Sequence, residues 1–216
     1  SITIPEGMTK LPNYAFAGSS NFARISLPST LTSIGSYAFY DCTGLTSIDI
    51  PVTVTEIENF TFYDCTGLTS VNIPAAVTII GEYAFSGCTG IKAIELPDGV
   101  TAIKYGAFSG CTNLESINIP VGWTSTTTYS GMSNIFDGCT KLRSITVPDG
   151  MTKLPNYAFA GCSNFARISL PSTLTSISSY AFYDCTGLVN FIVPEAVTSI
   201  AAYAFSGCTK LEHIWI

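Results

Sequence analysis

Eight cysteines have the most reactive side chains in this sequence, and they recur at a nearly fixed interval. Their sequence numbers rise in steps of 23, except for one step of 28: Cys42, Cys65, Cys88, Cys111, Cys139, Cys162, Cys185 and Cys208. In a secreted protein, this number of cysteines is typical of a disulfide framework. If each interval forms one coil of a stack, however, neighbouring Cβ atoms lie about 4.8 Å apart, beyond the roughly 3.5–4.5 Å of a disulfide. We therefore predict a ladder of buried free thiols that pack as small apolar groups.

The other reactive residues do not indicate a metal centre or a catalytic site. The cysteines include no C-x-x-C pair and do not cluster with histidine, so no metal site is predicted. His213 is the only histidine, and no serine or cysteine nucleophile stands in a triad arrangement with it. Paired carboxylates for glycoside hydrolysis need a cleft, whereas Asp49 and Glu95 belong to different predicted strands. The sequence has no glycine-rich phosphate loop either, so we expect no enzyme activity and no cofactor.

The composition is that of a folded protein with few charges. Of 216 residues, 47% are apolar and 11% are charged, against roughly 25% charged in an average globular chain. The net charge of −6 leaves no basic stripe for nucleic acid or for an anionic membrane surface. No apolar stretch reaches the roughly 18 residues of a transmembrane helix. The chain lacks an initial methionine and a leader, so either a signal peptide has been removed or the sequence begins inside a longer protein.

Internal repeats must position these residues. Prolines mark the same period of 23, broken once by an interval of 28: Pro5, Pro28, Pro51, Pro74, Pro97, Pro120, Pro148, Pro171 and Pro194. A longer duplication overlies this period, since residues 3–45 and 146–188 differ at only four positions. We therefore predict one domain over residues 1–216, with about nine turns and a five-residue insertion in the repeat spanning 120–147.

Each period is predicted to join a strand to a sharply turned arc. An apolar triplet such as Ile48-Asp49-Ile50 places two side chains on one face of an extended strand, and the following proline ends that strand. The residue before each cysteine is glycine or aspartate, as at Gly87 and Asp64. This column indicates a tight turn with positive φ rather than a calcium site. Stacked coils then bury the apolar face that one coil cannot bury alone.

The segment from Leu45 to Gly67 carries the whole repeat pattern, L-x-x-I-x-I-P-x-x-V-T-x-I-x-x-x-A-F-x-x-C-T-x, with Thr61 in place of the usual alanine. It resembles the BspA-like, or treponemal, class of leucine-rich repeat, and the resemblance covers essentially the whole chain. The resemblance implies a leucine-rich-repeat right-handed solenoid. Short parallel β-strands would lie on its concave face, and turns and short 3₁₀ segments on its convex face.

The same resemblance implies a function. Proteins of this class are typically secreted or attached to the surface of bacteria, where adhesion has been proposed. We therefore expect a non-catalytic protein-binding or adhesion module that is extracellular or at the cell surface. Its expected partner is an extracellular or cell-surface protein. The alternatives are a passive structural spacer of a larger surface protein and a glycan-binding module.

The outward positions of the predicted strands change from polar to apolar near the C-terminus. The middle residue of the triplet is polar in the earlier repeats, as at Asp49, but is Ile192 and then Trp215 in the last two. With Val189 and His213 beside them, these residues would form an exposed apolar patch, which is typical of a partner surface. Alternatively, a further C-terminal segment or a neighbouring chain covers this end, the latter by end-to-end self-association.

The insertion is the second candidate surface. Trp123 falls where valine normally packs and is expected to fill the core, while residues 124–130 are expected to loop out. Loops often carry function, although a neutral scar of the duplication is an equal alternative. The candidate partner-binding residues in this segment are Thr124, Ser125, Thr126 and Tyr129.

An aromatic column stands two positions before the recurring phenylalanine. It comprises Tyr14, Tyr37, Phe60, Tyr83, Tyr157, Tyr180 and Tyr203. We expect these rings to stack on the convex side, with contact to carbohydrate or protein as the alternative.

Overall fold

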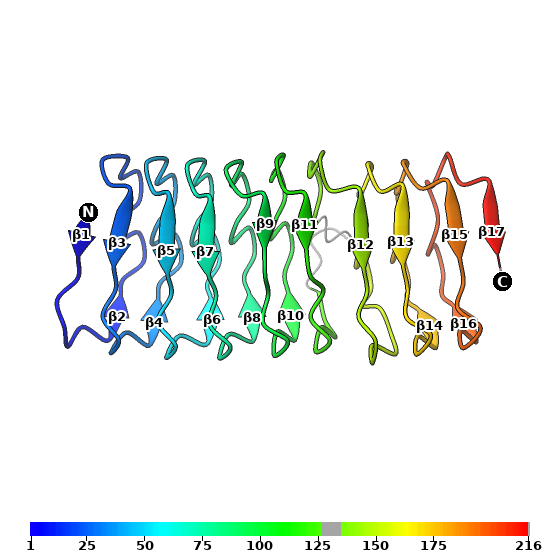
Figure 1. Cartoon of the computed structure of the whole chain (residues 1–216), viewed down its shortest axis with the longest axis horizontal. Helices are drawn as coiled ribbons and strands as arrows, with labels where there is room; N and C mark the ends of the chain where they lie inside the picture. Colours follow the sequence, from blue (N-terminus) through cyan, green and yellow to red (C-terminus); the bar gives the residue numbers. More distant parts are fainter. Residues whose placement is uncertain (127–134, 216) are drawn as a thin grey trace.

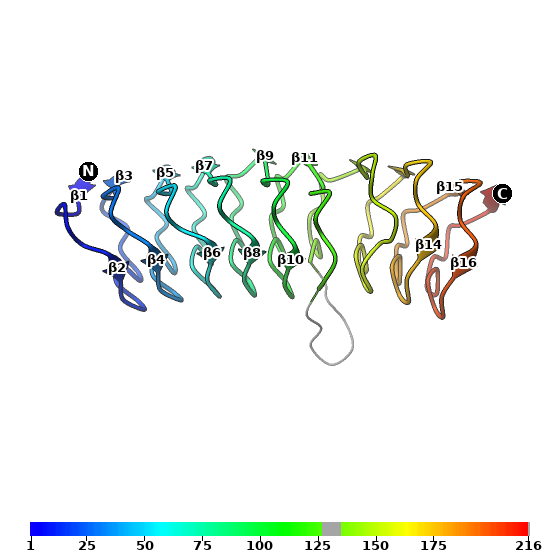
Figure 2. The same cartoon turned by 90° about the horizontal axis from the view of Figure 1, so that it is seen from below.

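The computed structural model describes residues 1–126 and 135–215, and it is a stack of similar coils (Figure 1). Each repeat makes one circuit, which brings Ser47 beside Ser70 at the same place in the next coil. The circuits advance along the long axis as a right-handed solenoid of about nine turns (Figures 1 and 2). Within the two described ranges the chain contains no α-helix. The fold expected from the repeat pattern is confirmed.

One side of the stack is a first ladder of parallel strands. Its strands are β1 (Ile2–Thr3), β3 (Arg24–Ser26), β5 (Ser47–Asp49), β7 (Ser70–Asn72), β9 (Ala93–Ile94), β11 (Ser116–Ile117), β12 (Ser144–Thr146), β13 (Arg167–Ser169), β15 (Asn190–Ile192) and β17 (His213–Trp215). The pairing keeps the repeat register, so Ile25 lies opposite Ile48, and both are buried. We call the outward side of this ladder the strand face.

A second ladder of short parallel strands lies along another side of the stack. The sequence indicated this segment only as a part of the coil that turns inward. Its strands are β2 (Lys10–Leu11), β4 (Ser33–Ile34), β6 (Glu56–Ile57), β8 (Ile79–Ile80), β10 (Ala102–Ile103), β14 (Ser176–Ile177) and β16 (Ser199–Ile200). Ile57 lies opposite Ile80, and both are fully buried.

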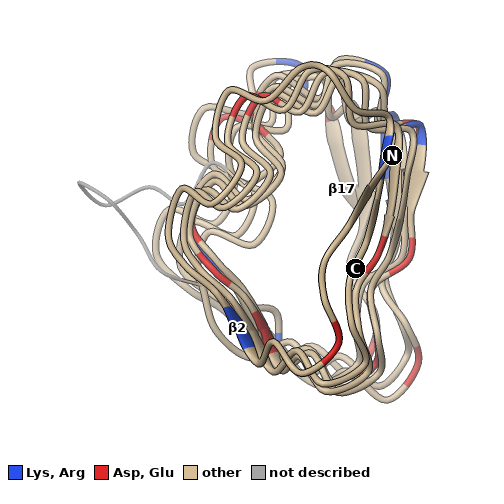
Figure 3. Cartoon of the chain, turned by 90° about the vertical axis from the view of Figure 1, so that its left-hand side faces the viewer, with Lys and Arg blue, Asp and Glu red and all other residues tan. Residues whose placement is uncertain are grey.

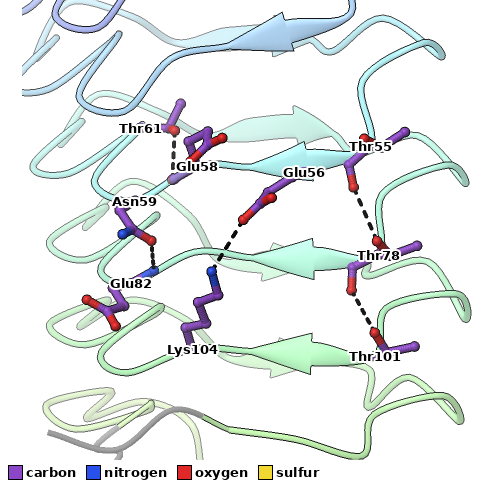
Figure 4. A network of polar contacts seen from close by, with 9 residues as sticks. All are labelled: Thr55, Glu56, Glu58, Asn59, Thr61, Thr78, Glu82, Thr101 and Lys104. Carbon is purple, nitrogen blue, oxygen red and sulfur yellow. Dashed lines mark hydrogen bonds and ion pairs between the residues drawn. The ribbon is translucent and has the colours of Figure 1, made fainter.

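Polar side chains join successive coils beside the second ladder (Figure 4). The hydroxyl of Thr78 donates to the carbonyl of Thr55 at 3.5 Å, and the hydroxyl of Thr101 donates to the carbonyl of Thr78 at 3.3 Å. Lys104 reaches across one coil to Glu56, with 3.3 Å between Nζ and Oε1 (Figure 4). Both charged side chains are partly exposed, so this ion pair contributes little to stability.

The arc between the second ladder and the cysteine column is held by two kinds of hydrogen bond. The N–H of Phe39 donates to the carbonyl of Thr61 in the next coil at 2.9 Å. The N–H of Ala38 instead donates to Gly35 in its own coil at 3.1 Å. The expected 3₁₀ segments are single turns of the second kind, and none extends into a 3₁₀ helix within 1–126 and 135–215. The arc thus satisfies its main-chain groups without regular structure.

Two positions of the arc adopt the left-handed backbone conformation. The predicted one precedes cysteine, with φ of 54° at Asp64 and 72° at Gly87. The second was not predicted, and it is the aromatic column, with φ of 59° at Tyr37. This conformation costs a residue with a Cβ about 1–2 kcal/mol. Stacking offsets part of that cost, since the ring centroid of Tyr37 lies 4.6 Å from those of Tyr14 and Phe60. The expected stacking is therefore confirmed.

Columns of cysteine and phenylalanine run through the core. The ring centroid of Phe62 lies 5.4 Å from that of Phe39 and 5.2 Å from that of Phe85, and all three rings are buried. All eight cysteines are unpaired, and all except Cys208 are buried. The predicted ladder of free thiols is confirmed, because the packing of identical coils uses the thiol as a small apolar group.

The first residues after Trp123 still belong to the solenoid. Trp123 is fully buried, as expected. The N–H groups of Thr124 and Ser125 then donate to the carbonyl of Thr101 in the preceding coil at 3.0 and 3.2 Å. The prediction that the loop begins at Thr124 is therefore wrong. The indole Nε1 of Trp123 donates to the carbonyl of Ser125 at 2.9 Å, which holds these residues in the second-ladder position.

Candidate binding surface

The strand face exposes the residues that flank each buried one. On β5, Ser47 and Asp49 lie on either side of buried Ile48, and only Asp49 is fully exposed. The middle residues of the triplets are exposed in every coil: Thr3, Ser26, Asp49, Asn72, Glu95, Asn118, Thr146, Ser169, Ile192 and Trp215. The outward direction predicted for this row is confirmed, and the row is polar until its last two members.

Charges are divided across the width of the strand face. Basic residues lie at or just before the strand starts: Arg24, Lys92, Arg143 and Arg167. Acidic residues lie at or after the strand ends: Glu6, Asp49, Glu95, Asp98, Asp149 and Glu195. Glu115 and Glu212 are the carboxylates on the starting side. In the end-on view of Figure 3, blue and red segments accordingly separate along the side that carries the strands.

Two hollows on the strand face are larger than a third, of about 370 Å³, which lies over β11 and β12. One, of about 920 Å³, extends over β12, β13 and β15, and its lining includes Ser144, Arg167 and Ile192. The other, of about 650 Å³, extends over β5, β7 and β9, and its lining includes Asp49, Asn72 and Glu95. The first hollow therefore combines a cation with an apolar wall, whereas these three residues give the second a polar and acidic lining.

The structure brings together the four residues predicted at the C-terminal end. Ile192 and Trp215 are register partners on β15 and β17, and 72% and 57% of their surfaces are exposed. The rings of His213 and Trp215 stack with 5.5 Å between centroids. Val189 is half-buried beside them, and its carbonyl accepts the N–H of Glu212 at 3.0 Å. We call Val189, Ile192, His213 and Trp215 the C-terminal patch.

The candidate residues of the insertion do not join this patch. Thr124 and Ser125 are exposed beside the second ladder, where Ser125 forms a bridge with Ala102. The hydroxyl of Thr126 donates to the carbonyl of Asn156 at 2.7 Å. Tyr129 lies outside the described residues. The two predicted surfaces thus belong to different sides of the coil.

The cysteine column is chemically quiet. The thiols of Cys65 and Cys88 each donate to a phenylalanine carbonyl of the preceding coil at 3.0 Å. Burial raises the pKa of Cys88, and it raises the pKa of Cys139 to about 12, so both thiols stay protonated at neutral pH. Across residues 1–126 and 135–215, no group of histidine, cysteine, aspartate and glutamate could hold a metal ion.

Sequence reasoning missed Arg143 and Arg167 as candidate binding residues. Both are exposed at the starting side of the strand face, and Arg167 lines the larger hollow. The available signal was a basic residue directly before, or two residues before, the strand isoleucine. The middle row of the triplets does not contain this position.

The comparisons with known proteins agree with this architecture. The family model described as BspA type leucine rich repeat region (6 copies) matches residues 1–80, 55–131 and 130–216. The chain belongs to the BspA-type leucine-rich repeat family. No curated protein matches this BspA-type chain.

Solved structures of bacterial leucine-rich repeat proteins resemble this BspA-type solenoid. A leucine-rich repeat protein from Bacteroides ovatus ATCC 8483 is 33% identical over 99% of this chain and 56% of its own, with a TM-score of 0.81. The present chain thus spans about half of that structure. The T. pallidum leucine rich repeat protein is 29% identical over 76% of each chain, with a TM-score of 0.65. Among the residues that the structure describes, no helix could cross a lipid bilayer.

Proposed function

We propose that this chain is a non-catalytic protein-binding module that acts outside the cell and presents its strand face to other proteins. The observation that carries the proposal is the exposed C-terminal patch beside the larger hollow. Exposed apolar side chains next to a polar sheet are typical of protein interfaces. The low charge of the chain as a whole lowers the cost of removing its surface from water.

Glycan binding through the aromatic column has less support. A sugar packs against the open face of an aromatic ring. Tyr180 has no open face, since its ring centroid lies 4.6 Å from that of Tyr157 and 4.9 Å from that of Tyr203. Among the described rings, Tyr14 and Tyr203 stand at the outer ends of their stacks and are 58% and 62% exposed.

The test is saturable binding of the purified chain to immobilised extracellular matrix proteins and mucin-type glycans. We expect saturable binding to a protein surface that Trp215→Ala weakens at least tenfold. Val52→Ala is the matched control, because Val52 is 76% exposed at the edge of the same face but away from the patch. Circular dichroism checks that both variants keep the fold.

The outcomes distinguish a protein-binding module from a glycan-binding module and from a structural spacer. Binding that depends on Trp215 and not on Val52 supports a protein-binding module. Competition by free sugars would favour the glycan reading. If nothing on the panel binds saturably, the chain is better described as a structural spacer, and the proposal is overturned.

A further inference from the structure

The larger hollow on the strand face is lined by polar groups that can bind an anion and by an apolar side chain. Hydroxyls of Ser144, Thr146 and Ser169 and the guanidinium of Arg167 line it from β12 and β13. Ile192 on β15 adds an exposed apolar side chain. The hollow continues into the C-terminal patch, because Ile192 belongs to both.

Two arginines on this part of the face have no anionic partner. Arg143 and Arg167 are exposed, and the side chain of neither forms an ion pair or a hydrogen bond with any residue of 1–126 or 135–215. Lys104, by contrast, is paired with Glu56 on the other ladder. A guanidinium presents a planar fork of donors that matches a carboxylate. The starting side of these strands is therefore prepared for an anion.

The internal duplication supplies a comparison within one molecule. Arg24 and Ser26 in the first copy correspond to Arg167 and Ser169 in the second, since residues 3–45 and 146–188 are nearly identical. The sequences of the two copies differ from the next strand onward. The first copy continues with Thr46, Asp49 and Val52, and the second with Val189, Ile192 and Glu195.

This divergence changes what each arginine faces. Arg24 pairs in register with Ser47, so Asp49 stands two residues further along the neighbouring strand, although the two side chains form no ion pair in the structure. At the equivalent place Arg167 meets Ile192 instead. The second copy has thus exchanged a carboxylate on the protein for an apolar wall, and a complementary ligand must bring its own carboxylate.

We propose that this hollow binds an extended peptide segment carrying a carboxylate side chain and, about three residues further on, a large apolar side chain. The carboxylate binds Arg167, which lines the hollow, with Arg143 next to the lining residue Ser144, and the apolar side chain packs on Ile192 and Trp215. Neighbouring coils are about 4.8 Å apart and Trp215 lies two residues further along its strand than the place equivalent to Arg167, so the two residues are separated by about 12 Å. An extended chain covers that distance in about three residues.

The charge distribution also determines at which edge of the hollow the ligand carboxylate binds. Glu195 lines the opposite edge of the hollow, at the ending side of the strands. A ligand carboxylate is therefore attracted to the starting side and repelled from the ending side. On the starting side, Glu115 lies one coil before Arg143 and Glu212 lies next to the apolar end of the site, and neither lines the hollow. The inference deepens the protein-binding function proposed above and rests on it.

The experiment uses the whole chain and a rhodamine-labelled peptide, Gly-Ser-Asp-Ser-Ser-Leu-Ser-Gly, followed by fluorescence anisotropy. The same peptide with asparagine for aspartate is the ligand control. We expect Arg167→Gln and Ile192→Asp to weaken binding of the aspartate peptide at least tenfold. Arg24→Gln is the matched protein control, and it should leave the affinity unchanged. Raising sodium chloride from about 50 to 300 mM should weaken binding severalfold.

Specific results would overturn the inference. It fails if the asparagine peptide binds as tightly as the aspartate peptide, if Arg24→Gln weakens binding as much as Arg167→Gln, or if no peptide binds. Its failure is distinguishable from that of the proposed function. If the chain binds an immobilised protein through Trp215 while Arg167→Gln has no effect on that binding, the peptide site is wrong and the module remains. If the peptide binds as expected but nothing on the protein panel does, the peptide site stands, whereas the function proposed above for extracellular proteins is overturned.

Discussion

At the scale of the residue, the buried thiol of Cys139 makes a stabilising contact that depends on its protonation. The thiol of Cys139 donates to the carbonyl of Phe108 at 3.1 Å, across the repeat that contains the insertion. Only the protonated thiol can make this bond, and burial excludes the thiolate. The buried thiols whose pKa is raised, such as Cys88 and Cys139, should therefore react slowly with thiol reagents in the folded protein, and their protonation should contribute to its stability.

We expect the folded protein to lose stability at alkaline pH. Burial raises the pKa of Cys139 to about 12 in the folded state, against about 8.5 for an exposed thiol. Because the folded state holds this proton more tightly, its contribution is complete below about pH 8.5 and declines as pH rises toward 12. The free energy of unfolding should fall by up to about 1.4 kcal/mol per pH unit for each such thiol. Urea denaturation at pH 8, 9 and 10 measures this slope.

The variant Cys139→Ala isolates the contribution of this one thiol to the pH dependence of the free energy of unfolding. It removes one titrating thiol, so the slope above pH 8.5 should become shallower by about 1.4 kcal/mol per pH unit. An unchanged slope would mean that this thiol ionises as readily in the folded state as in the unfolded state. Measurements stop at pH 10 because the tyrosines begin to titrate there.

At the scale of the element, the arc combines an unfavourable backbone conformation with favourable ring stacking. Tyr180 has φ of 59° and stacks on both neighbours. In the fifth coil, Gly106 takes this backbone position with φ of 62°, and Tyr105 meets Tyr83 edge to face. The repeat therefore tolerates two solutions, a strained tyrosine with full stacking or a relaxed glycine.

Two substitutions of Tyr180 separate these effects. Tyr180→Ala loses both stacking contacts and keeps the strained backbone, so we expect it to destabilise by about 1–3 kcal/mol. Tyr180→Gly loses the same contacts but relieves the strain, and it should be about 1 kcal/mol more stable than Tyr180→Ala. Urea denaturation at pH 7 compares the two. Equal stabilities would show that the left-handed conformation carries no cost at this position.

Much of the element structure was predictable because its cause is local and periodic. The apolar triplets predicted the first ladder, and the Gly or Asp before cysteine predicted one left-handed turn, as found at Asp64. The second ladder was missed because a two-residue strand such as β6 (Glu56–Ile57) has no alternation of its own, and its pairing comes from the coil beside it. The left-handed tyrosines were missed for a similar reason, since stacking between coils outweighs the local preference at Tyr37.

The candidate surface was less predictable than the fold. The C-terminal patch followed from the outward row, because Ile192 and Trp215 interrupt a polar column. The hollow beside it depends on how side chains of three neighbouring coils fit together, which no single repeat encodes. The prediction that the loop begins at Thr124 was wrong for a related reason. The N–H of Thr124 donates to the carbonyl of Thr101, which lies in the preceding coil.

At the scale of the whole molecule, the solenoid is held by contacts between adjacent coils in a fixed register. Each coil pairs with the next at a constant offset of one repeat, as Ser47 pairs with Ser70. Stability is then close to a sum over coils and their interfaces. The sequence accommodates a surplus of five residues in one repeat, whereas a missing residue must shorten a strand or an arc.

This register predicts different results for two deletions of almost equal length. Removing residues 70–92 takes out one whole period and brings Ala93 to the place of Ser70. We expect this variant to keep its far-ultraviolet circular dichroism per residue and to unfold in one transition. Its urea m-value should be lower by about a tenth, because one of about nine coils is gone.

Removing residues 70–93 deletes one residue more and leaves a coil that is one residue short. A slip of one residue turns the inward side chains of a strand outward, so the shortened coil cannot match both neighbours. We expect two separate transitions or a marked loss of structure, since the two halves no longer share a continuous ladder. Similar unfolding of the two variants would mean that burial of apolar area alone, and not the register of the ladders, joins the coils into one cooperative unit.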